Sequence, residues 1–158
     1  MSTLVAGIGN IFFSDDGFGS EVAGRMVGRA LPEDVRVEDY GIRGVHLALD
    51  LLEGCDLLVL VDAMASGDEP GTVCVLEPDT EADEEVAPLD AHLMDPLAVL
   101  RMVAEMGGSV GRVVVVGCEP ARLDEGIGLS APVAAAVDTA VRTVEELIAE
   151  RNVSCSVV

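Results

Sequence analysis

Two uninterrupted apolar runs constrain the fold of this chain more than any other feature. Residues 56–62 read DLLVLVD and residues 112–116 read RVVVV, and neither run alternates between apolar and polar side chains. A strand with one solvated face alternates, whereas a strand covered on both faces, as in a parallel sheet between helices, is apolar throughout. We therefore expect Leu57–Val61 and Val113–Val116 to be central, buried strands of an α/β fold.

The rest of the chain fits a single α/β domain over residues 1–152, with a flexible C-terminal tail over 153–158. Only residues 63–70 separate the strand at 56–62 from the next candidate strand, which is too short for a crossover helix, so this pair is expected to be antiparallel. The prediction is a three-layer α/β/α domain with a mixed, mostly parallel five-stranded sheet. The expected strands are 1–7, 35–39, 56–62, 71–76 and 112–116, and the expected helices are 17–31, 45–55, 96–107 (capped by Asp95) and 130–152.

The charge balance narrows the class of partner. The chain has 29 Asp and Glu against nine Arg and no Lys, a formal net charge of -20 at pH 7. Such a surface repels nucleic acid and anionic membranes, so we expect neither as a partner. The acidic segment 77–90 is interpreted as a solvated loop rather than a docking tail.

The N-terminus and the cysteines indicate a cytoplasmic protein. The first apolar stretch has no basic residues before it and is broken by glycines after residue 6, so it is neither a signal peptide nor a membrane span. Cys55, Cys74, Cys118 and Cys155 form no C-x-x-C pair. Reduced thiols are therefore expected rather than a disulfide framework.

The stretch GNIFFSDDGFG, residues 9–19, lies where α/β nucleotide-binding proteins carry a phosphate loop. The third glycine of G-x-G-x-x-G would fall at position 12, which is Phe12. Asp15 and Asp16 would stand beside a bound phosphate, and like charges about 4 Å apart cost roughly 4 kcal/mol each at an effective dielectric near 20. This repulsion exceeds what a helix dipole offers, so phosphate binding is disfavoured.

A cation site is a better interpretation of the same acids. Asp16 follows the first strand and Asp62 ends the third, and ligand sites in open α/β sheets lie beyond the C-terminal strand ends where the strand order reverses. His92 enters from the loop before the helix at 96. Two carboxylates and an imidazole suit a borderline divalent ion such as nickel, zinc or cobalt.

Each of these residues also has a structural interpretation. Asp15 or Asp16 could cap the following helix, and we expect that one of them does. Asp62 could cap a turn before Ser66, and His92 could be an exposed loop residue. Two further candidates are weaker: His46 is expected to be a surface or packing residue, and Glu119 is a fourth acid for the same crevice. G-x-S-x-G and H-E-x-x-H motifs are absent.

Taken together, the motifs resemble the hydrogenase maturation endopeptidases, the peptidases that process the large subunit of nickel-iron hydrogenases. The resemblance extends from Leu4 to about Glu150. Its motifs, in order, are GIGN at 7–10, SDDGFG at 14–19, VDA at 61–63, His92, VGCEP at 116–120 and GLS at 128–130.

The resemblance implies a phosphorylase/hydrolase-like fold and an activity. Members of that family bind metal at the positions of Asp16, Asp62 and His92 and remove a C-terminal extension from the large-subunit precursor after nickel insertion. The nickel is the substrate's own, and zinc or cadmium can substitute in crystals. The expected partner is therefore a nickel-loaded precursor of a nickel-iron hydrogenase large subunit.

The resemblance leaves three alternatives open: the choice of substrate, the role of nickel, and catalysis as against docking alone. Many relatives carry Asp-Gly-Gly-Thr after the second strand, where this chain has DYGIRG at 39–44, so Gly41, Ile42 and Arg43 are expected to set substrate choice. Nickel could polarise the scissile carbonyl, or it could serve for recognition while Asp16 or Asp62 acts as the base. A non-catalytic, nickel-dependent docking or chaperone protein is the alternative function.

Overall fold

The two apolar runs form the middle of the sheet, as predicted. The computed structural model describes residues 2–78 and 95–156, with side chains described as far as Arg151. Strands β3 (Cys55–Ala63) and β5 (Val110–Cys118) pair in parallel, and β1 (Thr3–Ile8) pairs in parallel with the other edge of β3. Leu57–Val61 and Val113–Val116 are buried throughout, which agrees with the cover on both faces that their sequence requires.

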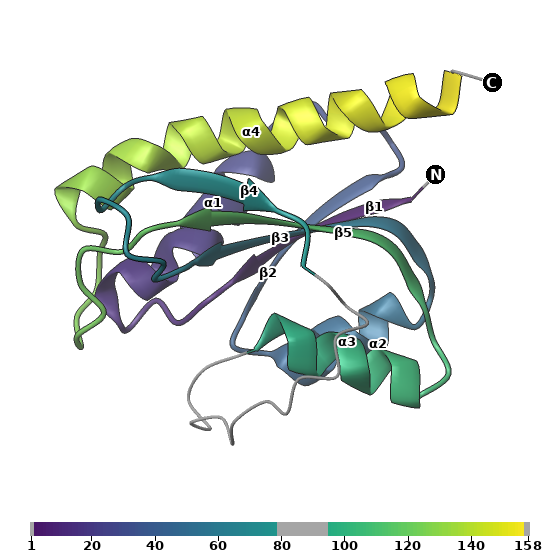
Figure 1. Ribbon diagram of the computed structural model, residues 1–158, viewed down its shortest axis with the longest axis horizontal. Coiled ribbons are helices and arrows are strands. Elements are labelled where there is room, and N and C mark those ends of the chain that lie inside the picture. Colours follow the sequence, from purple (N-terminus) through teal and green to yellow (C-terminus); the bar gives the residue numbers. More distant parts are fainter. Residues whose placement is uncertain (1, 79–94, 157–158) are drawn as a thin grey trace.

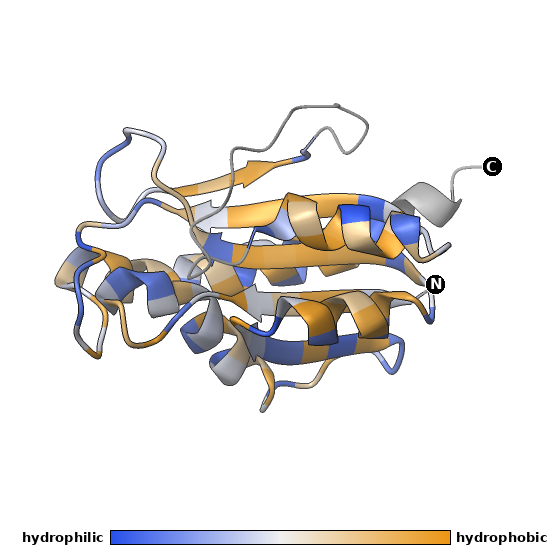
Figure 2. Cartoon of the chain, turned by 90° about the horizontal axis from the view of Figure 1, so that it is seen from below, coloured by the Kyte–Doolittle hydropathy of each residue, from blue (hydrophilic) through white to orange (hydrophobic). Residues whose placement is uncertain are grey.

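In the described part of the chain, four helices cover the sheet in two layers. The strand order is β2-β1-β3-β5-β4, with β2 (Val35–Gly41) and β4 (Val73–Leu76) at the edges. Helices α1 (Phe18–Met26) and α4 (Ala131–Ser156) pack on one face, and α2 (Gly44–Leu51) and α3 (Pro96–Glu105) pack on the other (Figure 1). Figure 2 shows the apolar colour concentrated along the central strands. The predicted three-layer α/β/α architecture with one antiparallel strand is confirmed.

The partner of the antiparallel strand differs from the prediction. β4 runs antiparallel to the other strands but pairs with β5, with Val73 opposite Cys118, and not with β3. Both edges of β3 are already occupied by β1 and β5. The chain therefore crosses the end of β5: the Met64 N–H donates to the Cys118 carbonyl (2.9 Å) and the Gly71 N–H to the Glu119 carbonyl (2.8 Å).

The helix ends also differ from the sequence pattern. α1 ends at Met26 rather than Leu31, shortly before Gly28, which favours termination. α4 continues to Ser156, so the backbone shows no break at the predicted boundary of residue 152, and residues 157–158 lie outside the described part. The cap of α3 is confirmed, since Asp95 Oδ1 accepts from the Leu97 N–H at 2.9 Å.

Within the described ranges, no helix has the length and apolar character needed to cross a membrane.

The strand order reverses between β1 and β3. The connection from β1 passes through α1 on one face to β2, and the return from β2 passes through α2 on the opposite face to β3. Residues that follow β1 and β3 therefore meet at the C-terminal edge of the sheet, on the left-hand side of Figure 1.

Candidate metal centre

Asp16 and Asp62 meet at this reversal point. Asp62 is the second-last residue of β3, where it pairs with Gly117 of β5. Asp16 belongs to the short 3-10 turn η1 (Ser14–Gly17), which joins the loop after β1 to α1. Both residues are partly buried. The topology thus brings together the two acids that the sequence singled out.

Glycines make this approach sterically possible. Gly9 has a φ of +134°, and a Cβ atom there would lie 1.9 Å from the Asp16 carbonyl oxygen and 3.6 Å from Asp62 Oδ1. At Gly19, in the first turn of α1, a Cβ atom would lie 2.2 Å from the Val61 carbonyl oxygen. The start of α1 can therefore rest directly on β3, which seats the Asp16 turn beside Asp62.

The electrostatics at this point favour a cation. Burial, and then the charge of Asp16, raise the pKa of Asp62 well above its ordinary value. Asp16 Oδ2 accepts one hydrogen bond, from the Asn10 N–H at 2.8 Å. Among the described residues, no Arg forms an ion pair with either carboxylate. Two neighbouring carboxylates that are not paired with a described Arg offer the oxygen ligands that a divalent metal ion takes.

The third predicted ligand, His92, lies outside the described residues. The described chain resumes at residue 95, immediately before α3. The three-ligand set of Asp16, Asp62 and His92 therefore stays a prediction.

The expectation that Asp15 or Asp16 caps the helix is wrong. Neither η1 nor α1 has a side-chain cap, and the residue before α1 is Gly17. Asp15 instead is fully buried and binds a distant loop: Oδ1 accepts from the Ser130 N–H (2.7 Å), and Oδ2 accepts from the Ser130 hydroxyl (2.8 Å) and the N–H groups of Ala121 (2.8 Å) and Arg122 (3.0 Å).

These contacts decide the protonation of Asp15. Burial on its own raises the pKa of Asp15, but the hydrogen bonds from Ser130, Arg122 and Ala121 outweigh burial and lower it. Asp15 therefore stays ionised and anchors residues 121–130 beside the candidate site. No local pattern in the sequence indicates this role, because the partners lie more than a hundred residues away.

Glu119, the weak fourth candidate, is occupied elsewhere. Its Oε2 accepts from the Ser66 N–H (2.6 Å) and hydroxyl (2.9 Å), and Oε1 accepts from the Gly67 N–H (3.3 Å). These hydrogen bonds lower the pKa of Glu119. Glu119 thus holds the 66–67 turn, which is the structural role considered above for Asp62.

The three residues expected to set substrate choice lie beside the Gly9 loop. The Gly9 N–H donates to the Gly41 carbonyl at 3.0 Å, which joins the end of β2 to the loop that leads to Asp16. Arg43, which follows β2, turns back on that strand, and its Nε donates to the Tyr40 carbonyl at 3.2 Å. Ile42 is 58% exposed, so it presents an apolar side chain at this edge.

A second group of potential ligands lies on β2 and α2. Glu38, His46 and Asp50 bring three ligand atoms within 4.8 Å of one another, so the group could hold a metal ion. Its carboxylates are already engaged, since Arg36 bonds to both and the Tyr40 hydroxyl donates to Asp50 Oδ2 at 2.6 Å. His46 is exposed and packs edge-on against Tyr40, with ring centroids 5.6 Å apart, as expected for a surface packing residue.

Known proteins are similar to this chain in sequence and in fold. The chain is 35% identical over 141 residues to the hydrogenase expression/formation protein HupD of Rhodobacter capsulatus (87% of this chain, 67% of that protein). It is 31% identical over 163 residues to the hydrogenase 2 maturation protease of Escherichia coli (97% and 94%). The structure of the hydrogenase maturating endopeptidase HybD from E. coli superposes with a TM-score of 0.81 at 27% identity, covering 96% of this chain and 94% of that one.

A family profile agrees with these relatives. The profile described as hydrogenase maturation protease matches residues 21–147, which include Asp62, the 41–43 loop and four of the five strands. The chain belongs to the hydrogenase maturation protease family.

Proposed function

We propose that this protease removes the C-terminal extension from the nickel-loaded precursor of a nickel-iron hydrogenase large subunit. Family membership supports the class of reaction, and a related structure of 25% identity is that of a [NiFe] hydrogenase maturation protease from Thermococcus kodakarensis. The observation that carries the nickel requirement is the Asp16–Asp62 pair, whose mutual repulsion a cation would relieve.

Asp16, Asp62 and His92 bind the nickel that the precursor brings. Three protein ligands leave coordination positions for donor atoms of the precursor, so the isolated protein holds nickel weakly. Nickel that belongs to the substrate acts first as a recognition group. Compensating the charge of the two carboxylates also lowers the pKa of Asp62, which makes it available as an anionic ligand.

Cleavage then follows hydrolytic chemistry. A water molecule attacks the scissile carbonyl carbon and loses a proton to Asp16 or Asp62, and the C–N bond breaks as the leaving nitrogen takes up a proton. Gly41, Ile42 and Arg43 form the part of the same edge that selects among precursors, with exposed Ile42 making the direct contact.

A cytoplasmic setting, where thiols stay reduced, is part of the proposal. Cys55, Cys74 and Cys118 are free thiols. Burial raises the pKa of Cys55, and burial together with nearby Asp15 raises the pKa of Cys118 to about 11, so both thiols stay protonated and unreactive at neutral pH.

Two measurements test this proposal. Soaking crystals with nickel, zinc or cadmium should place one ion between Asp16, Asp62 and His92, and a structure with His92 turned away from both carboxylates would exclude the three-ligand set. Incubation with nickel-loaded precursor, followed by intact mass spectrometry, should show loss of the C-terminal extension. Binding without any loss of mass would instead support the non-catalytic docking or chaperone function.

A further inference from the structure

The C-terminal edge of the sheet carries a group of exposed, large apolar side chains. We call this group the apolar rim. Its members come from two loops, one before η1 and one between β5 and α4. They are Ile11 (47% exposed), Phe12 (58%), Phe13 (38%), Leu123 (47%) and Ile127 (80%).

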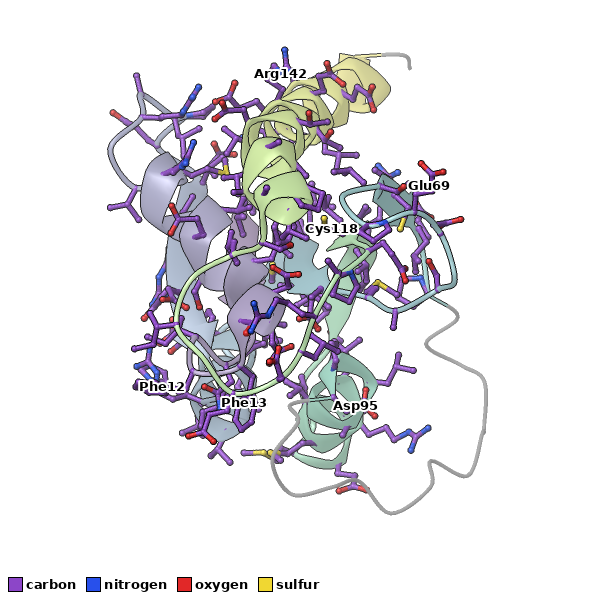
Figure 3. All side chains as sticks on the ribbon, turned by 90° about the vertical axis from the view of Figure 1, so that its left-hand side faces the viewer. Phe12, Phe13, Glu69, Asp95, Cys118 and Arg142 are labelled. Carbon is purple, nitrogen blue, oxygen red and sulfur yellow. The ribbon has the colours of Figure 1, made fainter. Side chains whose placement is uncertain are left out.

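The rim contains two of the few aromatic residues of the chain. The sequence contains three Phe, and Phe18 alone of them is buried, at the start of α1. Figure 3 views the molecule from the C-terminal ends of the parallel strands. In this view Phe12 and Phe13 lie together at one side of the edge. Contiguous exposed apolar side chains at one place on a protein surface indicate a surface that another molecule covers.

The two loops of the rim are held together by backbone hydrogen bonds. The Ser14 N–H donates to the Gly126 carbonyl at 2.8 Å, and the Gly126 N–H donates to the Phe12 carbonyl at 2.8 Å. Phe13 and Gly126 form an isolated parallel bridge. The buried Asp15 carboxylate adds the contacts to Ser130 described above. The rim is therefore preorganised, which lowers the entropy lost on binding.

A groove opens beside the rim, between α1 and the start of α4. Its volume is about 380 Å³. Ile11 and Ile127 belong both to the rim and to the groove wall, and Leu129 and Val137 add apolar surface. Glu21 and Arg25 are the charged residues of the wall, and they pair with each other at 3.5 Å. An apolar side chain entering from the rim would thus meet apolar surface first.

The rim is continuous with the Asp16 turn. Ile11, Phe12 and Phe13 belong to the same loop as Asn10, whose N–H bonds to the Asp16 carboxylate. Ser14 and Gly17, at the two ends of η1, line the groove. A macromolecule that delivers a metal ion and a peptide bond to Asp16 must therefore cover this loop.

From this continuity, we infer that the apolar rim and its groove are the docking surface for the precursor protein, and that apolar side chains of the precursor next to the cut fill them. The inference rests on the proposed function, because that function requires a polypeptide at Asp16. A docking surface of this kind lowers KM without taking part in the chemistry. Apolar docking also predicts that binding depends weakly on salt, in contrast to docking through the acidic surface.

The test is the dependence of cleavage rate on the concentration of nickel-loaded precursor. The double variant Phe12→Ser/Ile127→Ser should raise KM about tenfold or more with kcat nearly unchanged, because it removes two large contacts from a binding surface. Val27→Ser/Met106→Ser is the matched control: both residues are exposed (66% and 48%) at the ends of α1 and α3, away from the rim. Its KM should equal that of the wild type.

A second pair of variants tests the groove by filling it. Ala134 lines the groove, whereas its neighbour Ala135 is exposed on α4 and does not. Ala134→Trp should raise KM, and Ala135→Trp should not. All variants change exposed residues, so their thermal unfolding should match the wild type and separate a binding effect from misfolding.

The outcomes distinguish the two proposals. Wild-type protein that fails to cleave the loaded precursor contradicts the proposed function itself. If the wild type cleaves normally, and both the double variant and Ala134→Trp keep the wild-type KM, the docking inference is overturned while the proposed function stands. Light scattering tests a second copy of this chain as the occupant. If the wild type is a dimer, and Phe12→Ser/Ile127→Ser dissociates it without changing KM, the rim is a dimer interface and the docking inference is overturned.

Discussion

The charge of Asp16 acts on the carboxylate of Asp62 across the point where the strand order reverses. Burial first, and then Asp16, raise the pKa of Asp62 well above its ordinary value. Between them lies Gly9, where any side chain would collide with the Asp16 backbone. The metal-free edge is therefore an unfavourable arrangement of like charges, which an arriving cation converts into a favourable one.

The first prediction concerns the stability of the metal-free protein. Unfolded Asp62 titrates near its ordinary value of 3.8, and folded Asp62 titrates higher. Its contribution to stability is thus fully present below 3.8 and is lost as the pH rises through the folded pKa. Asp62→Asn removes this loss, so the free energy of unfolding of the variant, relative to that of the wild type, should increase as the pH rises from about 4 through the folded pKa of Asp62. Urea unfolding in the presence of a chelator measures this difference in free energy of unfolding. A difference that stays constant with pH would contradict the prediction.

The second prediction concerns Asp15. Asp15→Asn keeps the size of the side chain but replaces one acceptor oxygen with a donor, facing the donors of Ser130, Ala121 and Arg122. We expect a loss of about 3 kcal/mol or more in the free energy of unfolding. Asp138→Asn is the control, since Asp138 is 72% exposed and pairs with Arg25 at the surface, and it should change stability by less than about 1 kcal/mol.

The pH dependence of Asp15 has the opposite sign to that of Asp62. Its folded pKa is lower than its unfolded value of 3.8, so its stabilisation is present above 3.8 and is lost as the pH falls through the folded pKa. The gap between wild type and Asp15→Asn should therefore narrow in acid. A gap that widens in acid would show that the hydrogen bonds to Ser130 are not the source of the stability.

The third prediction concerns the seating of α1 on the sheet. Gly19→Ala places a methyl group 2.2 Å from the backbone oxygen of Val61, so α1 must shift, at a cost of at least about 2 kcal/mol. Gly24, in the same helix, has open space around the position that a methyl group would take, with no atom within 4 Å. Gly24→Ala should therefore stabilise the protein by about 0.5–1 kcal/mol. Equal effects of the two substitutions on urea unfolding would contradict this packing.

The central strands and the two acids were predictable because their signals are local or topological. An apolar run such as Leu57–Val61 specifies its own burial, and the order of strands and helices then brings the residues after β1 and β3 together. The partner of β4 was not predictable in this way. A short loop fixes the direction of a strand, but it does not say whether that strand pairs with β3 or crosses to the far side of β5.

Contacts between distant segments explain why the role of Asp15 was not predicted from the sequence. The sequence shows Asp15 next to a helix, where capping is the default expectation, but its partners lie 106 to 115 residues further along. Likewise, the exposure of Phe12 and Phe13 follows from their place in a loop pair, which a bridge between Phe13 and Gly126 joins.

The most direct test of the nickel-dependent site compares the cleavage of nickel-loaded and nickel-free precursor by the wild type, Asp62→Asn and His92→Ala, followed over time by intact mass spectrometry. We predict that the wild type processes only the loaded precursor, that added zinc does not replace the precursor's nickel, and that both variants process the loaded form much more slowly. Processing of nickel-free precursor at the rate of the loaded form, or normal processing by both variants, would contradict a nickel-dependent site at Asp16 and Asp62.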